Sequence, residues 1–247
     1  MALSSTGPFR YGPVSTGRAY PYRTGVGFVS SAEFAVFHDD FIQNVATNVP
    51  HGWKAAIIDT GATLTLSSTA GSLGAAGGAL IASDGASEGV AIYTEKGIQL
   101  TAGKKFVIEA RVQTNLAAET EVQIGLTDLT ATTNPEDLWT TTAANLVAFG
   151  TLPGSALTKM LSDKSNSGTS VQTGTRSLAN TTWHTLAIAY DGVNLRGYVD
   201  GKESLTWSSA ASTIPTGVAL SAFLGARTGA TAANITTFDY FRVMIER

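Results

Sequence analysis

Short runs of strand-forming residues recur along this chain about every ten positions. Gly, Asp, Asn and Ser separate the runs, and no stretch keeps a helical spacing of apolar residues for more than a turn or two. In residues 106–114 the even positions up to Val112 are apolar, whereas Glu109, Arg111 and Gln113 alternate with them. Successive strand residues point to opposite faces, so the apolar positions share one face, which we expect to be buried, and the polar positions share the other. The pattern predicts an all-β fold, a sandwich of two antiparallel sheets.

The expected strands are assigned from alternation and from β-branched or aromatic residues. They lie at residues 37–42, 53–59, 63–68, 78–83, 90–94, 106–114, 121–128, 145–150, 157–163, 169–174, 183–191, 195–200, 218–226 and 238–246.

Composition narrows the function classes. The 247 residues are 43% hydrophobic and 14% charged, with a net charge of −3 and no cysteine. The absence of cysteine excludes thiolate catalysis, zinc fingers, iron–sulfur clusters and disulfides. Without a clustered basic face we expect no nucleic-acid partner. No apolar run approaches the roughly 18 residues of a spanning helix, and Gly or Pro interrupts residues 1–30 too often for a signal peptide. We therefore expect a soluble chain that is made in a cytoplasm and has no membrane partner.

Residues 1–36 differ in character from the rest. Prolines alternate there with aromatic residues and arginines, and proline favours extended backbone. Aromatic rings seldom stay exposed, so we expect an extended arm that lies along a surface, either of its own domain or of a partner; a disordered tail is the alternative. Residues 37–247 would then form the sandwich. The candidate partner-binding residues of the arm are Phe9, Arg10, Tyr11, Arg18, Tyr20, Tyr22 and Arg23.

The strongest local signal is TTWHTLAIAYDGVNLRGYVDGKE at residues 181–203. Asp191-Gly192 and Asp200-Gly201 supply the backbone that tight turns require. This hairpin resembles the penultimate hairpin of laminin G-like and concanavalin A-like jelly rolls, and the resemblance covers roughly residues 37–247. It implies a concanavalin A-like jelly roll and leaves the function open, because that fold carries lectins, glycosidases and structural modules.

A domain of this kind with an arm but no cysteine or signal also resembles virion proteins of tailed bacteriophages. That resemblance implies a capsid decoration (cement) or head-fibre protein, located on the virion and assembled in the host cytoplasm. Its partner would be the major capsid protein, on which it would dock through the arm, with other copies of itself beside it. On this interpretation the chain is not an enzyme and has no catalytic residues.

A glycan-binding module for host attachment is the alternative function. Trp139 and Trp207 stand next to expected loops and are its candidate contacts, whereas Trp183 and Tyr240 are expected in the core. A glycoside hydrolase is the least favoured function, because the chain has no E-x-D-x-(x)-E string of the kind that such jelly-roll enzymes share. Glu119 and Glu121 alternate as such a string would, but Gln123 follows, and we expect this strand start to face solvent.

Two weaker signals remain. Residues 57–63 resemble the D-T-G loop of retropepsin-like aspartic proteases, but a strand that ends in an Asp-Thr-Gly turn explains them better. No cofactor or metal is expected. Calcium is the alternative, because one expected loop carries the oxygen ligands that calcium prefers, on Asp128, Asn134, Glu136 and Asp137.

Overall fold

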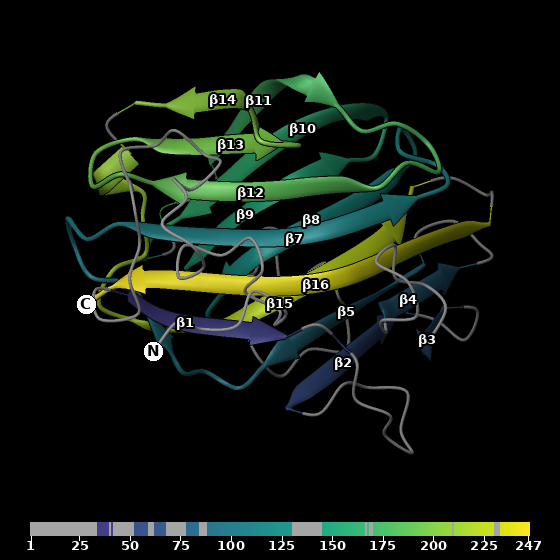
Figure 1. The fold of residues 1–247 in the computed structure, drawn as a ribbon, viewed down its shortest axis with the longest axis horizontal. Coiled ribbons are helices and arrows are strands. Elements are labelled where there is room, and N and C mark those ends of the chain that lie inside the picture. The colour runs from purple at the N-terminus through teal and green to yellow at the C-terminus, as the bar shows by residue number, and fades with distance from the viewer. Residues whose placement is uncertain are drawn as a thin grey trace, which may run out of the picture.

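The protein is described here from a computed structural model. It describes residues 34–39, 41, 52–58, 62–67, 78–83, 88–129, 145–165, 167, 170–208, 210–229 and 233–247. Two antiparallel sheets lie face to face, one in front of the other in Figure 1. The predicted all-β jelly-roll sandwich is therefore confirmed. Within the described ranges, no helix is long and apolar enough to cross a membrane.

Sheet A lies in front in Figure 1 and has the order β14-β13-β12-β7-β16-β4-β3. The first described strand, β1, also pairs with β16, so β4 and β1 follow one another along the same edge of that long strand. The strands are β1 (Phe34–Asp39), β3 (Thr63–Ser67), β4 (Gly78–Ser83), β7 (Phe106–Thr114), β12 (His184–Tyr190), β13 (Leu195–Val199), β14 (Lys202–Trp207) and β16 (Asn234–Glu246).

Sheet B lies behind and has the order β11-β10-β9-β8-β15-β5-β2, with β6 paired to β15. A short 3₁₀ helix at Ala210–Ser212 follows β14. The strands are β2 (Trp53–Ile58), β5 (Gly89–Thr94), β6 (Ile98–Gln99), β8 (Thr120–Thr127), β9 (Leu146–Leu152), β10 (Ser155–Asp163), β11 (Ser170–Ser177) and β15 (Ala219–Thr228).

The core fills the space between the two sheets. The even-numbered apolar side chains of β7 point into it, as their alternation predicts. Phe41, Trp53 and Phe241 pack edge to face there, and the Trp53 indole N–H donates to Asp39 Oδ2 (2.8 Å). Large apolar side chains from both sheets are fully buried, which supplies the main stabilisation of the fold.

Polar residues of the 181–203 hairpin hold its two turns. Asp191 Oδ1 accepts hydrogen bonds from the backbone N–H groups of Val193 and Asn194, which closes the first turn. Asp200 and Gly201 have φ angles of 53° and 72° in the second turn, a conformation that Asp and Gly tolerate. The motif therefore specifies the hairpin itself.

Most expected strands appear close to their predicted bounds. β4 and β7 match at both ends, whereas β6 and β14 are absent from the prediction. β14 has exposed polar residues at its start and two adjacent buried ones, so it lacks regular alternation. β1 begins at Phe34, so three residues that we placed in the arm belong to sheet A. The division into an arm and a sandwich stays a prediction, since residues 1–33 lie outside the described residues.

Candidate functional site

A band of charged and aromatic side chains crosses the outer face of sheet A, the face that points away from the core. It comes from β7, β16 and the residue before β12. Its members, called the polar band below, are Glu109, Arg111, Trp183, Asp239, Tyr240 and Arg242.

Glu109 and Arg242 form the buried half of the polar band. The two residues face each other across β7 and β16, with 2.5 Å between Arg242 Nη2 and Glu109 Oε1. Only 2% of Glu109 and 5% of Arg242 is exposed. The Tyr240 hydroxyl donates to the same Glu109 oxygen at 2.7 Å. Burying a charge is costly unless it is paired and hydrogen-bonded, and both conditions are met here.

The accessible half of the polar band is built around Trp183. The Arg111 guanidinium lies 5.1 Å from the centroid of the Trp183 ring, and Arg111 Nη1 lies 3.3 Å from Asp239 Oδ2. The register of β16 shifts between Phe238 and Tyr240, and this bulge brings Asp239 to Arg111 and Tyr240 to Glu109. Trp183, Arg111 and Tyr240 are each half-buried, so part of each remains accessible.

The electrostatics of the band follow from its burial. Burial and the neighbouring Glu109 carboxylate raise the pKa of Tyr240 well above its ordinary value, against the opposing effect of Arg242. The hydroxyl therefore keeps its proton and acts as a donor to Glu109 near neutral pH.

His184 stands next to Trp183 but has a structural role. Its Nε2 accepts a hydrogen bond from Ala179 N (2.9 Å), so Nδ1 carries the proton that is shared with Asp200 Oδ2 (2.8 Å). Asp200 Oδ1 in turn accepts from Thr185 N at 2.9 Å. The imidazole thus ties β12 to the Asp200 turn and leaves no ring nitrogen for a ligand.

The outer face of sheet B offers less to a ligand. Our expectation that the start of β8 faces solvent was wrong for Glu121, which is 2% exposed and lies 3.3 Å from Arg227 Nε. Gln123 is also buried and donates to Thr151 O (2.8 Å). A Cβ at Gly125 would lie 2.2 Å from Val147 O, so no side chain fits there. The outward positions of β8 therefore hold a carboxylate paired with Arg227, an amide and a glycine, and all three residues are buried.

A cleft of about 660 Å³ opens between the edge strand β1 and the segment around β6. Apolar side chains form much of its wall, among them Phe37, Ile98 and Ile245. Such a wall offers few hydrogen-bond groups to a hydroxyl-rich ligand, so the polar band is the stronger candidate site.

The structure brings few of the predicted site residues together. Trp207 ends β14 and is half-buried against the main core, so it is less open than we expected. Trp183 and Tyr240 were expected in the core but lie on the outer face instead. Outside the described residues lie Trp139 and all seven arm residues, which are Phe9, Arg10, Tyr11, Arg18, Tyr20, Tyr22 and Arg23.

The calcium loop is described only at its base. Both carboxylate oxygens of Asp128 accept hydrogen bonds from Asn145, at 3.2 Å from the backbone N and 2.9 Å from the side-chain nitrogen. Asn134, Glu136 and Asp137 lie outside the described residues, so the calcium prediction stays untested. The described part of the chain contains no group of three or more His, Asp or Glu side chains arranged to hold a metal ion.

Sequence reasoning missed the polar band as a site. The alternation of Glu109, Arg111 and Gln113 in β7 was its signal, because three polar residues on the outer face of a central strand need partners. The partners on β16 were hidden by the bulge, which shifts the inside–outside alternation after Phe238.

No protein-family model matches the sequence, and no curated protein matches it. Solved structures are similar in fold. A glycoside hydrolase family 16 endo-glucanase from Bacteroides ovatus has a TM-score of 0.57 at 12% identity, over 84% of this chain and 99% of that one. Peanut lectin has a TM-score of 0.59 at 8% identity, over 86% of this chain and 97% of the lectin. The Bacillus licheniformis β-glucanase has a TM-score of 0.53 at 12% identity, over 84% of this chain and 97% of the glucanase. At these identities the likeness shows a concanavalin A-like fold and nothing finer.

The expectation that the chain is not an enzyme was wrong. Glycoside hydrolase family 16 endo-glucanase and β-glucanase structures share its fold over nearly their whole length. None of the three structures named above is a virion protein.

Proposed function

We propose that this chain binds carbohydrate through the accessible half of the polar band. The observation that carries the proposal is the half-buried Trp183 ring, with the Arg111 guanidinium stacked on it and held by the buried Asp239 carboxylate. A sugar ring has an apolar C–H face and hydroxyl edges, so it needs an aromatic surface next to planar donors and acceptors. Trp183 supplies the aromatic surface, and Arg111, which the buried Asp239 holds in place, supplies the planar donors. The lectin and glucanase structures of the same fold are consistent with this function.

A glycan array with the wild-type chain tests the proposal directly. We expect saturable binding to a subset of glycans, and we expect Trp183→Ala to weaken it by roughly 10-fold or more, the effect of losing about 1.4 kcal/mol of contact. Trp207→Ala is the matched control, because Trp207 packs against the core and should leave binding unchanged. Binding that survives Trp183→Ala, or no binding to any glycan, would contradict the proposal.

Glycoside hydrolysis is the second candidate function. The fold shared with the endo-glucanase favours it, and the polar band holds two carboxylates, Glu109 and Asp239, on neighbouring strands. Hydrolysis requires two carboxyl groups roughly 5–9 Å apart, one of them able to give a proton. Each carboxylate here lies against an arginine, so one of these pairs would have to open around the substrate. Release of reducing ends that is abolished by Glu109→Gln supports hydrolysis; release that persists in Glu109→Gln assigns it elsewhere.

Attachment to a virion remains a proposal from the sequence. It places the chain on a capsid surface, bound to the major capsid protein through the arm residues. Co-sedimentation of the wild-type chain with capsids tests it, and replacing Arg10, Arg18 and Arg23 together with Ala should release the chain. Co-sedimentation that persists after this change would show that the three arm arginines do not hold the chain on the capsid.

A further inference from the structure

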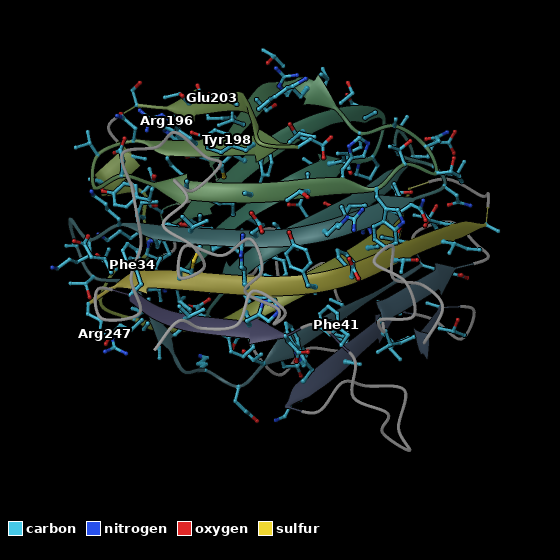
Figure 2. All side chains as sticks on the ribbon, in the orientation of Figure 1. Phe34, Phe41, Arg196, Tyr198, Glu203 and Arg247 are labelled. Carbon is cyan, nitrogen blue, oxygen red and sulfur yellow. The ribbon has the colours of Figure 1, made fainter. Side chains whose placement is uncertain are left out.

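The polar band offers donors to a sugar, but both of its carboxylates are buried. The outer face of sheet A is turned towards the viewer in Figure 2, with Phe34 of β1 and Tyr198 of β13 on either side of β12, β7 and β16. Arg111 carries only N–H donors. The Asp239 side chain is 4% exposed and already accepts from Arg111, and the Glu109 side chain is 3% exposed. Sugar hydroxyls donate as well as accept, so a sugar on this face needs an acceptor from a neighbouring residue.

Gln113 lies next to the accessible half of the polar band. It follows Arg111 by two residues on β7, so both side chains leave the outer face of that strand. The register of β12 with β7 pairs His184 with Val112. Trp183 and Gln113 therefore occupy the next positions of these two neighbouring segments, on the same face.

A hydrogen bond fixes which end of the Gln113 amide is available. Its Nε2 donates to the carbonyl oxygen of Thr181 at 2.7 Å. A carbonyl oxygen can only accept, so the flipped amide would lose this bond. Within the described part of the chain no group donates to Gln113 Oε1, and the residue is half-buried. The amide oxygen is therefore an accessible acceptor with a fixed orientation.

The residue that holds this amide has a strained backbone. Thr181 has a φ of 52°, a left-handed conformation that β-branched residues rarely adopt. Its N–H donates to Thr114 O at 2.7 Å and its carbonyl accepts from Gln113, so both of its backbone groups bind the end of β7. Strained residues persist where their contacts over-determine them, and they gather at ligand sites. Here the strain keeps the segment before Trp183 fixed on β7.

We propose that Gln113 is a ligand-binding residue, which accepts a hydrogen bond from a sugar hydroxyl through Oε1 while the sugar ring lies on Trp183. The inference rests on the carbohydrate-binding function proposed above and adds the acceptor that the polar band lacks. Arg111 and Gln113 then bind different hydroxyls, one as donor and one as acceptor, on the same side of the Trp183 ring.

The charges of the polar band favour a neutral sugar as this ligand. Its two arginines are matched by two carboxylates, Arg111 by Asp239 and Arg242 by Glu109. The Asp200 carboxylate also lies near Arg111. A sulfated or acidic sugar would therefore meet no uncompensated positive charge within the described band. A ligand that carries hydroxyls and no charge fits the site best.

Replacing the Gln113 amide tests whether its oxygen contacts the sugar. Gln113→Met keeps the length of the side chain but removes the acceptor. Methyl glycosides of glucose, galactose and mannose, and their monodeoxy analogues, are titrated into the full chain and followed by NMR. In wild type we expect the loss of one particular hydroxyl to weaken binding by roughly 5-fold or more, and in Gln113→Met by less than about 2-fold.

This comparison separates a ligand contact from a structural role. A Gln113 side chain that only held the loop would weaken the parent and deoxy sugars alike, so the wild-type preference would persist in Gln113→Met and the proposal would be overturned. Gln172→Met is the matched control, because Gln172 is exposed on β11 of sheet B and its replacement should keep the preference. Gln113→Ala is the second variant should Gln113→Met fail to fold by circular dichroism.

A glycan array that carries neutral, sulfated and uronic-acid glycans tests the class of ligand. We expect neutral glycans to bind, with a Kd that changes by less than about 2-fold between about 0.05 M and about 0.5 M NaCl. Preferred binding of sulfated or uronic-acid glycans that weakens with salt would overturn this inference. Such binding, if lost in Trp183→Ala, would still support carbohydrate binding by the polar band, so the two proposals fail separately.

Discussion

Single residues on the outer face of sheet A are explained by their partners. Glu109 and Arg242 are strand residues whose alternation could be predicted, but the sequence does not say that β7 and β16 are neighbours. A charged residue at an outward position is normally solvated. Only the pairing of strands far apart in the chain turns these two into a buried ion pair, which is why sequence reasoning could not find it.

Replacing one partner of the Glu109–Arg242 pair should lower the free energy of unfolding more than replacing both partners. Arg242→Leu leaves a buried carboxylate without its arginine, and we expect the free energy of unfolding to fall by about 3 kcal/mol. The double variant Glu109→Leu with Arg242→Leu should recover most of that loss. Urea unfolding of wild type, Arg242→Leu, Glu109→Leu and the double variant measures both effects. A double variant that loses the sum of two single losses would refute the coupling.

The Asp200 carboxylate should make part of the stability depend on pH. Burial alone would raise its pKa, but hydrogen bonds from His184 and Thr185 N, with Arg111 nearby, lower it below the ordinary 3.8. A carboxyl group whose pKa is lower in the folded than in the unfolded state stabilises the fold above its unfolded-state pKa. This stabilisation is lost as the pH falls through the folded-state pKa. The stability difference between wild type and Asp200→Asn should therefore be full at pH 6 and shrink below about pH 4. A constant difference in urea unfolding from pH 6 to pH 3 would contradict this assignment.

At the scale of elements, alternation and turn residues predicted most strands. β4 and β7 were predicted to the residue because their ends coincide with turn signals. β14 was missed because its two buried residues are adjacent, and β6 because a strand of two residues carries no period. The hairpin signature reached further, since Asp191 closes the first turn and Asp200 takes the positive φ of the second, as the motif predicts.

Packing between the two sheets requires a glycine at one position of this hairpin. A Cβ at Gly197 of β13 would lie 2.5 Å from the ring of Phe149 in sheet B. We expect Gly197→Ala to destabilise the fold by about 1–3 kcal/mol, because the fully buried ring would have to shift to admit the Cβ. Gly97→Ala is the matched control, since nothing lies within 4 Å of its added Cβ, and it should change stability by less than about 0.5 kcal/mol. Equal effects in thermal unfolding would contradict this account of the packing.

At the scale of the whole molecule, the sequence predicted the sandwich correctly but did not predict the polar band on the outer face of sheet A. A jelly roll buries its inner faces by alternation alone, but what lies on the two outer faces depends on contacts between distant segments. On sheet A those contacts create a polar band and an apolar patch side by side. On sheet B they bury Glu121 and Gln123 next to an apolar cluster that includes Ala91, Ala148 and Phe223. The two faces of this molecule therefore differ in what they can offer to a ligand.

Hydrogen–deuterium exchange of the full chain, with and without a glycan that binds it, tests the central claim most directly. If carbohydrate binds the polar band, exchange slows in segments 109–113, 183–186 and 239–242, which lie on three neighbouring strands of sheet A. Segments 146–152 and 155–163 of sheet B serve as the internal control and should not change. Slowed exchange confined to sheet B, with the three sheet A segments unchanged, would contradict the assignment of this site.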